Sequence, residues 1–192
     1  MKIIIAAGGT GGHVYPALSV AREFKENSAE VIWVGRKKSL EEGIAREEGF
    51  NFITLSVSGF LGKKVIEKIK AIFELCFAHI KAIYLLISFK PDAIFSTGGY
   101  ISLPVGLAAP LLRIPLFIHE QNSVAGLSNR ILNKFSRITF EGFPKTFKAD
   151  NRTEFVGNPL RDELFNKPKV MNKISQEFNV LVLGGSQGSS QL

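Results

Sequence analysis

The sequence predicts an α/β protein built on a Rossmann-like, doubly wound parallel sheet. Apolar runs rich in Ile, Val and Phe alternate with helix-like stretches along most of the 192 residues. Such near-continuous apolar runs are typical of parallel strands covered on both faces. The predicted strands are residues 2–7, 30–35, 51–55, 92–96, 115–119, 137–140, 154–156 and 179–183. The predicted helices are residues 16–26, 39–48, 63–89, 103–112 and 124–134.

Composition indicates a globular protein with an anionic partner. Apolar residues make up 45% of the chain, charged residues 21%, and the net charge is +7. This balance fits nucleic acid, phospholipid headgroups or a phosphorylated substrate. We expect no nucleic acid, because the sequence has no arginine-rich tract, RNP-like motif or zinc-finger spacing. The single cysteine, Cys76, excludes an internal disulfide framework, and its apolar helical setting predicts a core thiol.

The chain divides into three predicted parts. Residues 1–157 form an N-terminal domain, and residues 158–178 mix prolines and charges as a connector does. Residues 179–192 then give a new apolar strand and a second glycine loop, 184–188. We expect this last part to be the start of a second α/β domain that is cut short.

A glycine loop follows the first predicted strand. Glycine occupies positions 8, 9, 11 and 12, Thr10 lies among them, His13 follows, and Pro16 is expected to open a helix. Backbone N–H groups of such a loop converge on an anion at a helix N-terminus. The loop matches neither the dinucleotide fingerprint, which needs glycine where Val14 stands, nor the Walker pattern. His13 is therefore either a general base beside an anion site or a capping histidine.

Two further polar clusters end neighbouring strands of the predicted sheet. Residues 97–100 follow the fourth strand and residues 119–122 follow the fifth. Since ligands gather at the carboxyl ends of parallel strands, the clusters and the glycine loop predict one composite site. Strand alternation points His119 and Gln121 one way and Glu120 and Asn122 the other. Glu120 within reach of His13 would orient its ring or raise its pKa.

The long helix at residues 63–89 carries two apolar sets. One is a stripe at helical spacing that is expected to face the sheet: Val65, Ile69, Ile72, Cys76, Ile80, Ile83 and Ile87. The other lies about a quarter-turn away and is bordered by lysines: Ile66, Phe73, Phe77 and Tyr84, with Lys63, Lys70 and Lys81. The second set is either a broad core face or a patch that enters an anionic membrane surface. His79, on the same helix, is expected to be structural or to face solvent.

Five ordered motifs resemble the MurG family of glycosyltransferases. They are residues 8–17, 96–102, 119–122, 157–161 and 184–188. The resemblance spans the whole chain and implies the N-terminal half of a GT-B glycosyltransferase, with two Rossmann-like domains around a cleft. It implies an inverting, metal-independent and cofactor-free transfer of N-acetylglucosamine from UDP-N-acetylglucosamine to lipid I, giving lipid II in peptidoglycan synthesis. It also implies a peripheral protein on the cytoplasmic face of the cell membrane.

The resemblance assigns roles to individual residues. Thr10, Gly11 and Gly12 would contact a substrate diphosphate, and His13 is the favoured base, with Glu120 as the alternative. The remaining substrate contacts would come from Tyr100, His119, Asn122, Asn129, Arg161 and Ser186, the last two on the donor side. The resemblance also favours the membrane interpretation of the long helix.

Three functional expectations stay open from the sequence. The chain is expected to be an acceptor-side fragment that is inactive alone. A related GT-B enzyme with another acceptor, or a nucleotide-sugar epimerase, would share the scaffold. The alternative from another class is a non-catalytic acceptor-binding or membrane-docking subunit of a two-chain glycosyltransferase.

Overall fold

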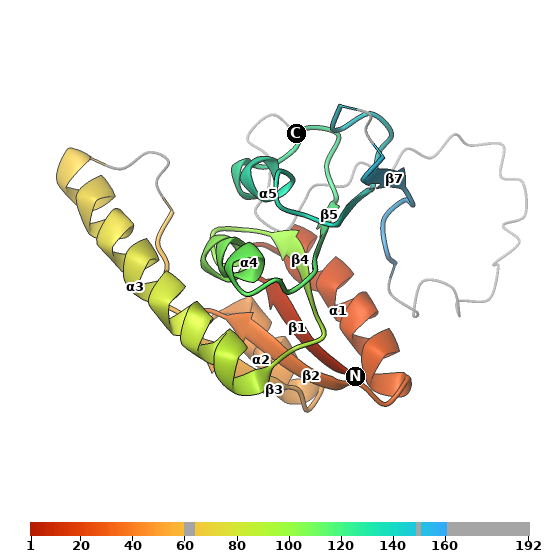
Figure 1. The fold of residues 1–192 in the computed structure, drawn as a ribbon, viewed down its shortest axis with the longest axis horizontal. Helices are drawn as coiled ribbons and strands as arrows, with labels where there is room; N and C mark the ends of the chain where they lie inside the picture. The colour runs from red at the N-terminus through yellow and green to blue at the C-terminus, as the bar shows by residue number, and fades with distance from the viewer. Residues whose placement is uncertain (60–63, 149–150, 161–192) are drawn as a thin grey trace, which may run out of the picture.

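A seven-stranded parallel sheet organises the protein (Figure 1). The computed structural model describes residues 1–59, 64–148 and 151–160. The strand order is β3-β2-β1-β4-β5-β6-β7, and every neighbouring pair is parallel. The strands are β1 Lys2–Ala7, β2 Glu30–Gly35, β3 Asn51–Thr54, β4 Ala93–Gly98, β5 Leu116–Glu120, β6 Ile138–Glu141 and β7 Thr153–Phe155. The predicted fold class is confirmed, and the predicted strand 179–183 lies outside the described residues.

The chain changes winding direction between β1 and β4. It runs outward from β1 through β2 to β3 and then returns to place β4 on the other side of β1. The carboxyl ends of β1 and β4 therefore flank a topological switch point, where α/β sheets bind ligands.

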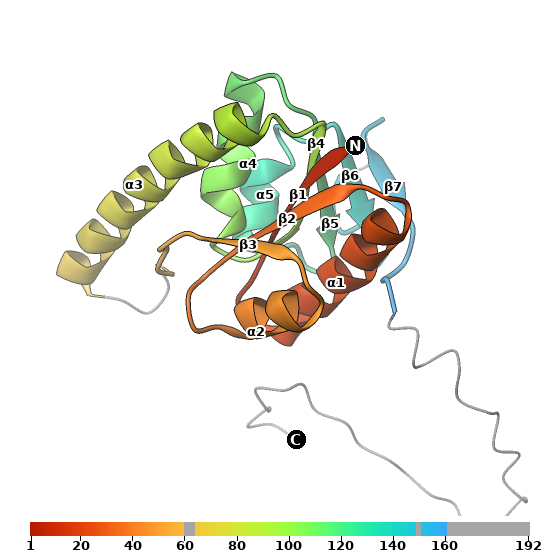
Figure 2. The same ribbon diagram turned by 90° about the horizontal axis from the view of Figure 1, so that it is seen from below.

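Helices cover both faces of the sheet (Figure 2). They are α1 Gly11–Glu26, α2 Leu40–Glu47, α3 Val65–Phe89, α4 Ser102–Leu111 and α5 Leu127–Leu132. Alternate residues of β1 enter two separate cores: Ile3 and Ile5 pack with residues of α1 and α2, and Ile4 and Ala6 with residues of α3 and α4. This two-sided burial explains the near-continuous apolar strand sequences.

The first helix begins five residues earlier than predicted. Thr10 is its N-cap, Gly11 its first residue, and Pro16 lies inside it. The amides of His13 and Val14 donate to the Thr10 carbonyl, 3.0 and 3.1 Å away, so the first turn is already formed at the glycines. The expectation that Pro16 opens the helix was wrong, because it relied on the preference of proline for a first turn. As a consequence, His13 stands on a helix and not in a loop.

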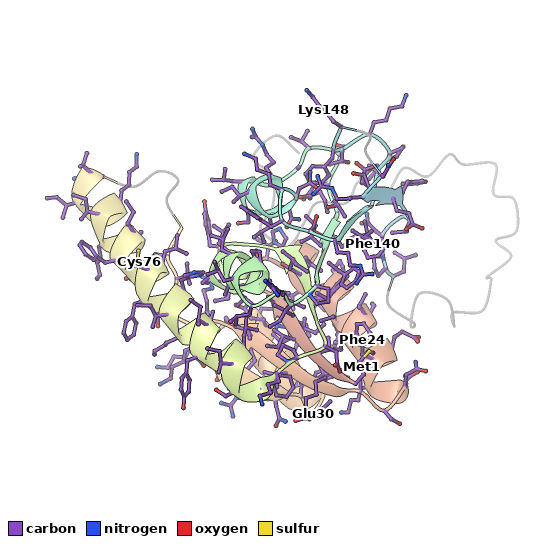
Figure 3. The ribbon with its side chains drawn as sticks, viewed as in Figure 1. Met1, Phe24, Glu30, Cys76, Phe140 and Lys148 are labelled. Carbon is purple, nitrogen blue, oxygen red and sulfur yellow. The ribbon has the colours of Figure 1, made fainter. Side chains whose placement is uncertain are left out.

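The buried face of α3 differs from the predicted stripe. Its buried residues are Ala71, Ala78, Ala82, Leu86 and Phe89. The predicted core residues are instead exposed, apart from partly buried Ile83: Val65, Ile69, Ile72, Cys76, Ile80 and Ile87. Cys76 is thus an exposed thiol on α3 and not a core thiol (Figure 3).

Small side chains explain this arrangement of α3. Alanines at the contact let α3 approach closely, so the larger apolar side chains are left on the outer surface. His79 Nδ1 lies 2.9 Å from the Pro104 carbonyl oxygen of α4, which confirms a structural role for this histidine. Figure 1 shows α3 extending past the sheet beside α4.

Candidate active site

Two adjoining cavities lie where β1, β4 and β5 end. Each has a volume of about 160 Å³, and they share His13, Gly99 and Tyr100. The glycine loop and Arg36 line one cavity, and Glu120 and Asn129 line the other. The three predicted clusters thus meet at this edge of the sheet, and Glu120 is the residue of the 119–122 cluster that lines a cavity there.

The glycine loop after β1 meets Gly99, which follows β4, backbone to backbone. Gly99 has a φ of +82°, and a Cβ on it would stand 2.2 Å from the Gly8 carbonyl oxygen. Gly9 also adopts a positive φ, +108°. Only glycine satisfies both the backbone conformation and the close approach at position 99. The glycines thus bring the end of β4 against the loop that carries His13.

His13 is oriented by its helix and by Thr10. Its Nδ1 lies 3.2 Å from Thr10 Oγ1, and no side chain within the described residues caps α1. If Nδ1 carries the ring proton and donates it to Thr10, Nε2 keeps a free lone pair. Burial lowers the pKa of His13, and the negative charge of Glu120 partly opposes that shift. The imidazole is therefore neutral near pH 7, as a general base must be.

Glu120 is a buried carboxylate surrounded by donors. Its Oε1 accepts from the backbone N and the Nδ2 of Asn122, at 3.0 and 2.9 Å. Its Oε2 accepts from the Gly126 backbone N and from Asn129 Nδ2, both at 3.0 Å. Glu120 is 1% exposed, held by these four hydrogen bonds, and lines the same cavity as His13.

Asn129 lines the same cavity and holds Glu120. Its Nδ2 donates to Glu120 and to the His119 carbonyl, which fixes the orientation of the amide. Its Oδ1 is buried and has no hydrogen-bond partner among the described residues. A buried acceptor without a partner costs free energy, so the two bonds made by Nδ2 outweigh the loss at Oδ1.

His119 lies on the other face of the sheet, as strand alternation predicts. It lines an apolar cavity of about 490 Å³ together with Met1, Phe24 and Phe140, which Figure 3 labels. Its Nε2 lies 2.9 Å from the Gly157 carbonyl oxygen, and its Nδ1 lies 3.1 Å from Gln121 Nε2. Burial lowers the pKa of His119, against the raising effects of the Gly157 carbonyl and of Glu120. The structure thus joins His119 to the chain after β7 and does not bring it to His13.

Of the other candidate residues, two lie at the site and two lie outside the part of the chain that the structure describes. Tyr100 lines both site cavities, and exposed Asn122 donates to Glu120. Arg161 and Ser186 lie outside the described residues. No group of three His, Cys, Asp or Glu side chains within the described ranges is arranged to hold a metal ion.

Sequence reasoning missed Glu41 and Arg36. Glu41 is fully buried beneath the glycine loop, and Arg36 borders the cavity of that loop. The available signal was a glycine at the carboxyl end of both β1 and β2, Gly8 and Gly35, with an acid in the helix that follows β2. An acidic residue in a first helical turn is usually explained by its favourable interaction with the helix dipole. Glu41 was therefore not recognised as a buried residue of the site.

The fold and the site define a Rossmann-like domain with a glycine-rich loop at a helix N-terminus and with His13 and Glu120 lining one cavity. The chain belongs to glycosyltransferase family 28, whose N-terminal domain model matches residues 3–140. This finding and the relatives below confirm the MurG resemblance.

Curated relatives from Coxiella burnetii and Ectopseudomonas mendocina are 41% and 40% identical over 194 and 191 residues. Both carry the name UDP-N-acetylglucosamine--N-acetylmuramyl-(pentapeptide) pyrophosphoryl-undecaprenol N-acetylglucosamine transferase. Each match covers 100% of this chain and 54% of the relative. The chain thus spans about half the length of the curated relatives it matches.

Solved structures agree with this family. The crystal structure of MurG from Acinetobacter baumannii matches with a TM-score of 0.79 at 33% identity, covering 97% of this chain and 53% of that one. A UDP-GlcNAc 2-epimerase from Neisseria meningitidis matches with a TM-score of 0.60 at 15% identity, covering 82% of this chain and 46% of that one. The second likeness shows the fold alone.

Proposed function

We propose that this chain is the acceptor-binding half of an inverting glycosyltransferase that transfers N-acetylglucosamine from UDP-N-acetylglucosamine to lipid I. The observation that carries the proposal is the cavity that His13, Glu120 and Asn129 line together. The names of the curated relatives supply the donor and the undecaprenyl-linked acceptor. No observation favours the two-chain alternative.

The proposed reaction needs one base and no covalent intermediate. His13 Nε2 removes the proton from the attacking 4-hydroxyl of the acceptor. The oxygen bonds to C1 of N-acetylglucosamine as the bond from C1 to the diphosphate breaks, and UDP leaves with the electron pair. The imidazolium that forms lies beside the carboxylate of Glu120, which stabilises it. Asn129 holds the carboxylate of Glu120 in place through its Nδ2.

The glycine loop is suited to the acceptor diphosphate. The N-terminus of α1 is formed by Thr10, Gly11 and Gly12, and its positive end favours an anion. The donor nucleotide would be held largely by the part of the enzyme that this chain does not share with its full-length relatives. We therefore expect the 192-residue chain alone to form no lipid II.

The test is lipid II formation by the protein expressed from the complete reading frame that contains this sequence. His13→Ala is expected to lower kcat by roughly 10²-fold or more, as loss of a general base does. His79→Gln is the matched control, because His79 is hydrogen-bonded to the Pro104 carbonyl and lines neither of the two site cavities. Turnover near wild type in His13→Ala would remove His13 from the base role. Lipid II formation by the isolated chain would refute its expected inactivity.

We further propose that α3 docks the protein on the cytoplasmic face of the membrane. Ile66, Phe73, Phe77 and Tyr84 are all exposed, by 82%, 72%, 60% and 76%. Exposed Lys70 and Lys81 accompany them, with Lys81 Nζ 4.9 Å from the centre of the Phe77 ring, while Lys63 lies outside the described residues. An apolar face edged by lysines is suited to anionic headgroups.

The connections of α3 favour a helix that lies on the membrane. By length and composition α3 is apolar enough to span a bilayer, and only 17% of its most apolar window is buried. However, β3 and β4 flank it in the chain and lie in the same sheet. Its alanine face also packs against the domain, so only its outer face is available to lipid.

Vesicle co-sedimentation tests the docking proposal. Phe73→Ser together with Phe77→Ser is expected to weaken binding to anionic vesicles at least tenfold, because each buried phenylalanine contributes about 1.5–3 kcal/mol. Phe155→Ser is the matched control, since Phe155 is exposed on β7 at the sheet edge. Unchanged vesicle binding by the folded double variant would contradict docking through this face.

A further inference from the structure

The cavity of the glycine loop is bordered by a cation that the proposed reaction does not yet use. Arg36 follows β2 and lines this cavity with Gly8, Gly9, Thr10 and His13. Its side chain is 46% exposed, and its Nε lies 3.5 Å from Glu41 Oε1. A guanidinium with one edge on a carboxylate still has its other N–H groups for a second anion.

Glu41 contacts the backbone on two sides of this cavity. Its Oε1 accepts from the backbone N of Arg36 at 3.2 Å, and its Oε2 lies 3.5 Å from the backbone N of Gly9. A Cβ on Gly8 would stand 2.5 Å from Glu41 Oε1, and one on Gly35 would stand 2.6 Å from Glu41 Cγ. The two strand-end glycines therefore leave the space that the carboxylate occupies.

The burial of Glu41 calls for compensation. Its side chain is fully buried, and a buried carboxylate is costly unless it is paired and hydrogen-bonded. Arg36 is the cation that pairs with it, and the Arg36 and Gly9 amides are its donors. The pairing thus fixes the position of Arg36 relative to the glycine loop.

We propose that Arg36 contacts a phosphate oxygen of a diphosphate ester in this cavity, and that Glu41 is the positioning residue that holds Arg36 there. The first turn of α1 borders the same cavity through Thr10 and His13, so the helix dipole and the guanidinium act on one anion. This inference rests on the proposed function, in which the substrates carry diphosphates. It adds a charged contact and a positioning residue to that site.

A positioning role and a purely electrostatic role of Glu41 predict opposite changes in anion binding when Glu41 is replaced. If Glu41 acted only through its charge, its removal would strengthen anion binding, because a negative charge near the cavity would be lost. If Glu41 positions Arg36, its removal weakens anion binding although the net charge becomes more positive. The sign of the change therefore separates the two roles.

The experiment is calorimetric titration of the 192-residue chain with inorganic pyrophosphate. Arg36→Ala is expected to raise Kd about tenfold or more, as loss of a charge-assisted hydrogen bond does. Glu41→Gln, which keeps the side-chain size, is expected to raise Kd several-fold. Glu42→Gln is the matched control and is expected to leave Kd unchanged, because Glu42 pairs with exposed Arg46 at 2.8 Å and does not line the cavity.

Two results would overturn the proposal. Arg36→Ala with the Kd of the wild type removes the phosphate contact, and Glu41→Gln with an equal or lower Kd removes the positioning role. Folding is followed by the fluorescence of Trp33, the single tryptophan, whose buried Nε1 donates to the Ala7 carbonyl at 3.0 Å. If Glu41→Gln does not fold, Glu41→Asp tests the same contact, because it withdraws the carboxylate from Arg36 by one methylene.

Two ligands distinguish the source of the diphosphate. UDP represents the donor and farnesyl diphosphate represents a prenyl-linked acceptor. If Arg36→Ala weakens the binding of UDP or of farnesyl diphosphate, the result supports the site and identifies the source of the diphosphate. If both ligands bind Arg36→Ala as tightly as the wild type, the proposed phosphate contact is overturned. The outcome is separable from the proposed function: Arg36-dependent pyrophosphate binding without transferase activity of the full reading frame would refute the function alone.

Discussion

Replacing Glu120 by glutamine tests how much the hydrogen bonds of its carboxylate contribute to the free energy of unfolding. The carboxylate accepts four hydrogen bonds, two at each oxygen. A glutamine has the same shape, but its NH₂ group replaces one oxygen and faces two donors. We expect the NH₂ group to take the position of Oε1, because Asn122 on that side is exposed and water can serve its donors.

The cost follows from the bonds that are lost. Two donors lose their acceptor, and each donor left without one costs about 1–3 kcal/mol when it is buried. Solvation of Asn122 reduces this sum, so we expect the free energy of unfolding to fall by about 2–3 kcal/mol. Such a loss is large against the about 5–15 kcal/mol that stabilises a typical domain.

Urea unfolding followed by Trp33 fluorescence measures this loss. Glu154→Gln is the control, because Glu154 is exposed on β7 and its change is expected to stay within about 0.5 kcal/mol. A Glu120→Gln variant as stable as the control would refute the assignment of Glu120 as a fixed acceptor of four bonds.

The remaining predictions concern pH and packing. Burial lowers the pKa of His13, so the acid limb of kcat/KM for the full reading frame should have its midpoint below pH 6.5. Because the pKa of His13 is lower in the folded protein, the unfolded chain binds a proton there more tightly than the folded chain does. The free energy of unfolding should therefore fall as pH drops below about 6.5, and a rise would contradict the shift. Gly43→Ala should stabilise α2 by about 0.5–1 kcal/mol, since its Cβ would meet open space. Gly106→Ala should instead destabilise by about 1–3 kcal/mol, because its Cβ would stand 2.6 Å from Leu132 Cδ2; equal Tm values for the two variants would refute this packing.

The strand pattern made most of the sheet predictable. β1 and β2 have the predicted bounds, since their apolar runs are long and end at glycines. Alternation along β5 correctly separated His119 from Glu120, because successive strand side chains point to opposite faces. These rules depend only on neighbours in the chain.

The buried faces of α3 and α2 required information from other elements. The outer face of α3 is more apolar than its buried alanine face, so hydrophobicity alone selected the wrong stripe. Glu41 is buried because Gly8 and Gly35 leave space above α2, and these two glycines come together only when β1 and β2 pair in the sheet. In both cases the space available between elements decides the outcome, and not the polarity of the residue.

The alanine contact of α3 has a consequence for the evolution of this domain. The residues that fix α3 to the domain, such as Ala78 and Ala82, are different from those on its outer face, such as Phe73 and Phe77. Substitutions on the outer face therefore leave the core volume unchanged. Selection can tune the affinity of α3 for whatever surface it meets, residue by residue, without a compensating change in the sheet.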